Sequence, residues 1–303
     1  MTLDRIRTGL GHPCFAGAIR WGLRSVQGIW PLDDFWQQLT VTVEHAEMFA
    51  FEDAYRAAPP DFAAGTGMRC EWLGAALLVS LPAIDAKVFN RVLGLGTIEP
   101  ATEEIIDRAL AHFHESRVYD HAFPVTGDTQ PAEVSEWLHR RGMQPIDSWV
   151  KVYRDNAPVQ PIKTDLRVVE IGPDAAWHFA DAVSEGFGSP DWQGYWLSAL
   201  VGRPGWRIYV AYDGDTPAAT GAMFVRDGVA WLGFGATRPE FRRRGAQGAI
   251  MAQRLQDGID MGCKWFVTET WEPGPDEPNP SLNNMYRSGF QFAFRRLNYA
   301  YPE

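Results

Sequence analysis

The chain has 303 residues, of which 46% are hydrophobic, and a formal net charge of −10. This length suits two domains of ordinary size, and the apolar content, with 13 tryptophans, argues against a disordered chain. Proteins that bind nucleic acid usually carry a basic face, so the acidic balance disfavours a nucleic-acid partner.

Neither the cysteines nor the first residues suggest secretion or a membrane. Cys14, Cys70 and Cys263 are scattered and lack metal-ligand spacing, which predicts reduced thiols and no metal site. Charged residues interrupt any signal-peptide pattern near the N-terminus, and no apolar stretch is long enough to cross a bilayer. We therefore expect a soluble, cytoplasmic protein.

Two pairs of segments resemble each other along the chain. Residues 92–100, Val-Leu-Gly-Leu-Gly-Thr-Ile-Glu-Pro, align with residues 231–239, Trp-Leu-Gly-Phe-Gly-Ala-Thr-Arg-Pro. Further on, residues 138–143 resemble residues 285–290, and a strand-like stretch follows each copy. The matching order predicts two related units.

A linker with two prolines separates the two units. Pro158 and Pro161 interrupt residues 156–164, which is typical of a connecting segment. We therefore expect one domain over residues 1–155 and a second over residues 165–303.

The second unit predicts an alternation of strands and helices. Alternating apolar residues between turn signals predict strands, and apolar residues at helical spacing predict helices. Strands are expected at 166–171, 207–212, 218–226, 228–237, 263–271 and 292–301, and helices at 174–187, 245–261 and 281–288. The fold class is therefore α+β, with a mixed, mostly antiparallel twisted sheet flanked by helices in each unit.

A basic, glycine-containing helix start follows the strand that ends before Pro239. Arg242, Arg243 and Arg244 are consecutive, and Gly245 comes directly after them. Free N–H groups at a helix N-terminus beside arginines form an anion site that suits a pyrophosphate. This predicts a nucleotide-bearing ligand.

The first unit differs from the second at this place. Glu103 and Glu104 align with Arg242 and Arg243, and isoleucine replaces the glycine at 245. Carboxylates in the first turn of a helix repel a phosphate, and a bulky side chain prevents close backbone approach. We expect the first unit to be structural or to contribute to the acceptor side.

The order of elements and the Arg-Gly helix start resemble the GCN5-related N-acetyltransferase (GNAT) superfamily, from about residue 166 to residue 301. The first unit resembles a degenerate copy, which implies a tandem arrangement. The family's acyl-CoA motif, R/Q-x-x-G-x-G/A, matches Arg242-Arg-Arg-Gly245-Ala-Gln247 except at its last position. There Gln247 replaces the small residue, and Gly248 follows.

The resemblance implies which residues contact acetyl-CoA. The loop would hold the pyrophosphate, and the end of the preceding strand would bind the pantetheine and polarise the thioester carbonyl. Asn284 lies where family members contact CoA, although it could also be a turn asparagine near a helix start. The complete set of expected contacts is Gly235, Ala236, Thr237, Arg242, Arg243, Arg244, Gly245, Ala246, Gln247, Gly248 and Asn284.

Two residues, Glu269 and Tyr286, are the main candidates for proton transfer. Glu269 falls on the strand beside the expected thioester and could accept the amine proton, or it could be a structural carboxylate. Glu185 is a weaker candidate base. The family often has a tyrosine acid in the last helix; here Met285 holds that place and Tyr286 comes one residue late. Tyr286 could equally be an ordinary surface or packing residue.

The aromatic residues Trp192, Tyr195, Trp196 and Trp206 lie where related proteins approach the acceptor. They could enclose an apolar or cationic group, or they could pack between the two units.

The resemblance implies an acyl-CoA-dependent N-acyltransferase. It would transfer an acetyl group from acetyl-CoA directly to an amine of a small molecule or peptide; a homodimer is left open. One alternative is a non-catalytic acyl-CoA-binding or sensing protein. Another is an aminoacyl-tRNA-dependent transferase, which the negative charge and the arginine motif disfavour.

Overall fold

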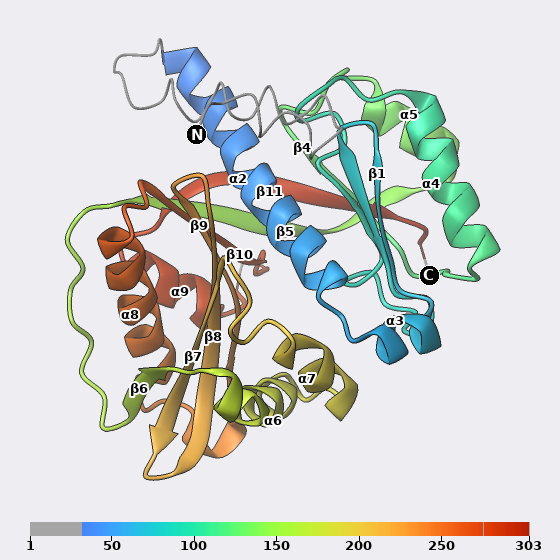
Figure 1. Cartoon of the computed structure of the whole chain (residues 1–303). Helices are drawn as coiled ribbons and strands as arrows, with labels where there is room; N and C mark the ends of the chain where they lie inside the picture. The colour runs from blue at the N-terminus through green and yellow to red at the C-terminus, as the bar shows by residue number, and fades with distance from the viewer. Residues whose placement is uncertain (1–31, 275, 303) are drawn as a thin grey trace, which may run out of the picture.

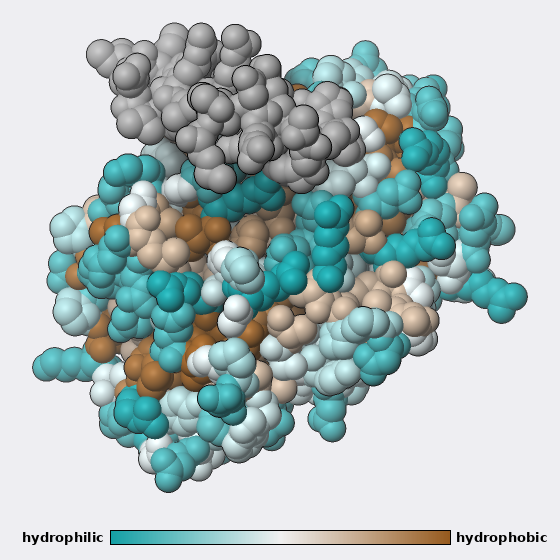
Figure 2. Space-filling model, viewed as in Figure 1, coloured by the Kyte–Doolittle hydropathy of each residue, from teal (hydrophilic) through white to brown (hydrophobic). Residues whose placement is uncertain are grey.

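The computed structural model describes residues 32–302 except residue 275 (Figure 1). Cys14 and the N-terminal segment of the first expected domain lie outside these residues. An eight-stranded sheet runs through both halves of the described chain, and a three-stranded sheet belongs to the first half. Hydrophilic residues cover most of the face in Figure 2, with smaller hydrophobic areas between them.

The first half begins with helices and continues as a strand-rich unit. Long apolar side chains on one stripe of the first helix pack toward the sheets. The elements are α2 (Leu32–Arg56), α3 (Pro60–Thr66), β1 (Arg69–Leu73), β2 (Ala76–Ser80), β3 (Arg91–Leu93), α4 (Glu103–Glu115), β4 (Phe123–Thr126), α5 (Val134–Arg140) and β5 (Gln144–Asp155).

The second half contains every strand and helix that the sequence predicts, with ends shifted by a few residues. It also has one further helix, α7. The elements are β6 (Arg167–Glu170), α6 (Ala176–Phe187), α7 (Asp191–Ser198), β7 (Trp206–Asp213), β8 (Thr216–Arg226), β9 (Val229–Thr237), α8 (Ala246–Asp260), β10 (Trp265–Trp271), α9 (Pro280–Arg287) and β11 (Gln291–Ala300).

The large sheet mixes strands from both halves, in the order β4-β11-β5-β10-β9-β8-β7-β6. The sequence predicts a separate sheet for each unit, and the structure differs on this point. β5 lies between β11 and β10 and pairs antiparallel with both, so that Lys151 is opposite Glu269 and Trp149 is opposite Arg296. Each long final strand thereby has partners on both edges over part of its length, which protects those edges from pairing with another chain.

β9 and β10 pair only at one end and then diverge. They run parallel, and their register covers three residue pairs, the last of which joins Val267 to Trp231. The β8–β9 register then shifts, and Phe234 takes a left-handed φ of 50°. This bulge bends β9 away from β10, so the two strands open into a split at their carboxyl ends.

The two faces of the sheet around this split pack against different helices. On one face, Phe266 contacts the Gly258 region of α8, and Leu282 and Met285 of α9 join the same apolar cluster. On the other face, Val267 and Trp231 pack in a cluster with α2 and α6. Because neighbouring strand residues point to opposite faces, even-numbered β10 residues face α8 and α9, and odd-numbered ones face α2.

Candidate functional site

The start of α8 leaves a row of backbone N–H groups without acceptors. Gly245 caps the helix with a left-handed φ of 80°, and its turn has no side-chain cap. The six amides of residues 243–248 donate to no oxygen of the described residues. Orphan amides at a helix N-terminus, together with the helix dipole, favour an anion.

Two arginines lie beside these amides on the surface. Arg243 is exposed, has a left-handed φ of 65° and makes no ion pair within the described part of the chain. Arg242 is also exposed and makes only long hydrogen bonds, such as that from Nε to the Thr237 carbonyl at 3.3 Å. Both guanidinium groups can therefore reach a phosphate without breaking an existing ion pair.

Arg244 has a different role from the one the sequence predicts. Its guanidinium binds Asp165 and also Asp213, whose Oδ2 lies 2.7 Å from Nη1. These contacts anchor the loop to Asp165, which directly follows the linker, and to Asp213 at the end of β7. The side chain is therefore structural, and only its amide remains available to an anion.

Gln247 also uses its side chain within the protein. Its Nε2 donates to the Ala236 carbonyl at 2.7 Å, to the Thr220 carbonyl at 3.1 Å and to Thr237 Oγ1 at 3.1 Å. The amide thus binds both strands next to the place where the β8–β9 register shifts. This explains why a glutamine is accommodated where the family pattern has glycine or alanine.

The end of β9 lines the split that separates it from β10. Gly235 is exposed, Ala236 is buried and Thr237 is half-buried. Beyond the three residue pairs that join the strands, one side-chain bond crosses the gap, from Thr268 Oγ1 to the Leu232 carbonyl at 2.7 Å. The split leads from the open amides of α8 into the sheet.

Glu269 lies just beyond the last β9–β10 pair and faces α2. Its Oε2 lies 2.5 Å from Lys151 Nζ and 2.6 Å from Arg296 Nη2. Only 8% of its side chain is exposed. The structure thus places the predicted base at the split, but in contact with two cations.

These contacts belong to a larger cluster of buried charges, which we call the charge cluster. Its members are Glu44 and Glu47 of α2, Arg91 of β3, Lys151 of β5, Glu269 of β10 and Arg296 of β11. Of these six residues, only Glu269 is predicted from the sequence to have a role in the site. The available signal was an isolated lysine or arginine inside an apolar strand, and two glutamates three residues apart on an apolar helix.

The cluster shifts the pKa values of its two central carboxylates in opposite directions. Burial raises the pKa of Glu269, and the adjacent charge of Glu47 adds to this, while Arg296 and Lys151 oppose it. Burial also acts to raise the pKa of Glu47, but Arg296, Lys151 and Arg91 outweigh it and hold that pKa well below its usual range. Opposed shifts in neighbouring carboxyls are typical of acid–base sites.

Tyr286 and Asn284 do not come close to Glu269. Tyr286 is 43% exposed and projects from α9, whereas Met285 points into the core beneath that helix. Glu269 faces α2 on the other side of the sheet. Asn284 is half-buried, and its Oδ1 accepts from Arg287 at 3.1 Å.

The aromatic residues near α7 pack between the two halves. Trp196 is fully buried, stacks on Phe62 and donates from Nε1 to the Ala54 carbonyl at 2.8 Å. Trp206 donates to Asp53, and Tyr195 donates to Asp61. The packing interpretation of these residues is therefore confirmed.

Three further findings concern Glu185, metal binding and membrane spans. Glu185, the weaker candidate base, pairs with Arg238 at 2.8 Å on the surface. Within residues 32–302, no group of three or more histidine, cysteine, aspartate or glutamate side chains could hold a metal ion. No described helix is long and apolar enough to cross a membrane.

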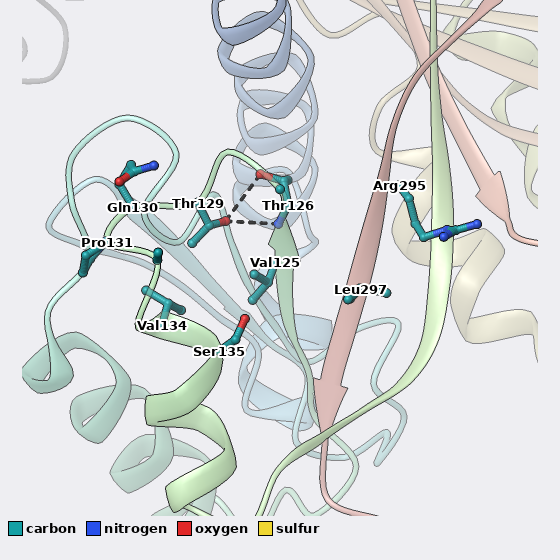
Figure 3. Close-up of a pocket in the computed structure, with 11 residues that line it drawn as sticks. Val125, Thr126, Thr129, Gln130, Pro131, Val134, Ser135, Arg295 and Leu297 are labelled. Carbon is teal, nitrogen blue, oxygen red and sulfur yellow. Dashed lines mark hydrogen bonds between the residues drawn. The ribbon is translucent and has the colours of Figure 1, made fainter.

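A cavity of about 400 Å³ lies away from the start of α8, between elements of the first half and β11 (Figure 3). It is bounded by the end of β4, the following loop, the start of α5 and one edge of β11. Arg295 is the one charged residue in its lining, and that side chain pairs with Glu272. Thr126 and Thr129 bond to each other, and no carboxylate or histidine lines the cavity. Its lining therefore offers no base for acyl transfer.

Comparison with known proteins agrees with this arrangement. Residues 173–268 match the acetyltransferase (GNAT) domain family. A GCN5-related N-acetyltransferase from Kribbella flavida has a similar structure, with a TM-score of 0.58 at 14% identity, over 82% of this chain and 95% of that one. A GCN5-related N-acetyltransferase from Sphaerobacter thermophilus gives 0.53 at 15% identity, over 74% and 79%. The sequence has no match among curated proteins.

Proposed function

We propose that the chain is an N-acetyltransferase whose second half, which contains the match to the acetyltransferase (GNAT) domain family, transfers an acetyl group from acetyl-CoA to an amine of a small molecule or peptide. The observation that carries this proposal is the start of α8. Among the described residues, six amides there have no acceptor and two arginines have no ion-pair partner, and they lie near the split between β9 and β10. The free amides and the arginines suit a pyrophosphate, and the separated strand edge suits the chain attached to it.

The residues at the α8 start fit the donor. Amides 243–248 and the side chains of Arg242 and Arg243 would hold the pyrophosphate, while Arg244 and Gln247 fix the loop from behind. The edge of β9 from Gly235 to Thr237 would pair with the pantetheine. Bound acetyl-CoA supplies the acetyl thioester, and an amide of β9 would stabilise the charge that develops on its carbonyl oxygen.

Glu269 would take the proton of the acceptor. The amine nitrogen forms a bond to the acetyl carbon, the carbon–sulfur bond breaks, and the amine proton passes to the carboxylate of Glu269. The thiolate takes its proton from solvent, since a thiol with an ordinary pKa of about 8.5 is a good leaving group. Tyr286 has no part in this scheme because it faces outward from α9.

We also propose that the chain is a tandem of two GNAT-like copies. Residues 69–155 follow the order β-β-β-α-β-α-β, and residues 206–300 follow the same order. The structural similarity to the Kribbella flavida protein extends over 82% of this chain, more than the second half alone. In this arrangement the final strand of each copy is inserted into the other copy's part of the sheet.

Binding and turnover measurements test the proposed activity. We expect acetyl-CoA to bind the full chain in calorimetry, and a panel of primary amines to increase CoA thiol release above the rate of hydrolysis. Tight binding without turnover on any amine would favour the sensing alternative. No binding of acetyl-CoA would overturn the proposal.

A further inference from the structure

The charge cluster lies between the two halves of the chain. Its three carboxylates and three cations leave it formally neutral among the described residues. Replacing a buried ion cluster by well-packed apolar residues is often neutral or stabilising, so stability is a weak reason for keeping six buried charges. The position of the cluster at the split suggests a role in the chemistry.

Two carboxylates in the cluster share the same two cations. Lys151 Nζ lies 2.5 Å from Glu47 Oε2 and 2.5 Å from Glu269 Oε2. Arg296 also contacts both, with Nη2 2.6 Å from Glu269 Oε2 and Nη1 against Glu47. The orientation of Glu269 is therefore fixed by contacts to one of its two oxygens.

The other oxygen of Glu269 contacts neither of these cations. Both ion pairs use Oε2, while the carboxyl as a whole also lies within hydrogen-bond reach of Glu47. Glu269 also has the most exposed side chain in the cluster, at 8%, while those of Glu47 and Arg296 are fully buried. Glu269 is therefore the member of the cluster that we expect an acceptor amine to meet.

We infer that Glu47 and Lys151, which both come from the first half of the chain, are positioning residues for Glu269. Together they hold Oε2 and leave Oε1 to receive the proton of the acceptor amine. This inference rests on the proposed function, and it gives the first half a part in the reaction although that half lacks an open anion site.

The surrounding charges set the direction of each expected effect. The described charged groups that face Glu269 are Glu44 and Glu47 from α2, Arg91 from β3, Lys151 from β5 and Arg296 from β11. Removing the charge of Glu47 takes away an influence that raises the pKa of Glu269, so that pKa should fall. Removing Lys151 takes away a cation that lowers the pKa, which should then rise.

Titration of Glu269 tests the inference without knowledge of the acceptor. The full chain is labelled with ¹³C at the glutamate side-chain carboxyls, and the Glu269 signal is assigned by its loss in Glu269→Gln. We expect the wild-type signal to titrate above the ordinary value of 4.5. Glu47→Gln should move it down and Lys151→Met should move it up, each by about one pH unit.

Two variants serve as matched controls. Glu44→Gln removes an equally buried carboxylate from the same helix. Glu44 contacts Arg296 at 3.3 Å and Lys151 at 4.0 Å but not Glu269, so its shift should be much smaller. Lys151→Arg keeps the cation and should restore the wild-type titration. For the amine with the fastest turnover, the acidic limb of kcat/KM against pH should move in the same direction as the titration.

Each outcome has a definite meaning. Opposite shifts in Glu47→Gln and Lys151→Met, with unchanged affinity for acetyl-CoA, support the inference. A wild-type Glu269 that titrates at or below 4.5, or equal shifts in Glu44→Gln and Glu47→Gln, overturns it while leaving the proposed activity intact. Absence of acetyl-CoA binding in the wild type overturns the proposed function instead.

Discussion

The starts of α8 and α4 correspond in the sequence repeat but satisfy their backbone groups in opposite ways. At α4, Thr102 Oγ1 accepts from the Ile105 amide at 3.3 Å, and Glu103 follows and pairs with Arg140. At α8 a left-handed glycine takes the cap position, and no side chain caps the helix. One helix start is closed by its own side chain, whereas the other is open to an anion.

The strands beside these helix starts differ in the same sense. In the first half, the Gln130 amide donates to the Gly96 carbonyl at 2.8 Å, and the Gln130 carbonyl accepts from Ala101 at 2.7 Å. These bonds bridge the place where β3 and β4 would otherwise diverge. In the second half, β9 and β10 separate after three pairs. Similar sequences thus give a bridged pair of strands in the first half and a separated pair in the second.

The largest expected effect comes from making the α8 start resemble the α4 start. The double variant Arg242→Glu, Arg243→Glu should weaken acetyl-CoA binding by about 100-fold, because two charge-assisted contacts of roughly tenfold each are lost. Calorimetry measures the affinity, and circular dichroism checks the fold. Glu104→Arg, an exposed charge reversal on α4, is the matched control and should leave the affinity unchanged. Equal affinities in all three proteins would contradict the comparison.

A smaller effect is expected from a methyl group at the α8 cap. The Cβ added in Gly245→Ala would lie 2.9 Å from the Lys163 carbonyl oxygen, and the residue needs a left-handed φ. The loop must therefore shift, and we expect acetyl-CoA affinity to fall about tenfold, which corresponds to about 1.4 kcal/mol. In calorimetry, Gly262→Ala is the control, since that glycine has φ +84° but open space around it. An equal loss in both variants would show that the loop position does not matter.

Removing the cap of α4 should affect stability alone. Thr102→Ala removes the side-chain acceptor of the Ile105 amide, leaving only the Thr102 carbonyl at 3.2 Å, and should lower the free energy of unfolding by about 1 kcal/mol. Urea denaturation measures this loss. Acetyl-CoA affinity should stay at the wild-type value, and a change in it would mean that the first half takes part in donor binding.

The smallest effect is expected at Tyr286. Because its side chain is on the outer surface of α9, Tyr286→Phe should change turnover by less than twofold at any pH. Steady-state kinetics with the fastest amine measures this. A large fall in kcat at unchanged acetyl-CoA affinity would instead assign the hydroxyl a role in protonating the leaving thiolate.

The sequence was most informative about local structure in the second half. Apolar alternation predicted its strands, and the helical spacing of Ala252, Leu255 and Ile259 predicted α8, since these patterns depend on neighbouring residues. The Arg-Gly motif likewise predicted an open helix start. The roles of Arg244 and Gln247 were not predictable, because their partners Asp213 and Thr220 are about 30 residues away in sequence.

The sequence by itself therefore determined the elements of the second half and the position of its open helix start, because hydrophobic period and helix-start chemistry are local. Only the tertiary structure decided that β5 crosses into the second half and that Glu269 meets Lys151 and Glu47. Lys151 and Glu47 are 104 residues apart, and Arg296 and Glu47 are 249 apart. Such contacts form only when the whole sheet is assembled, since no local pattern encodes which distant charge will face a buried carboxylate.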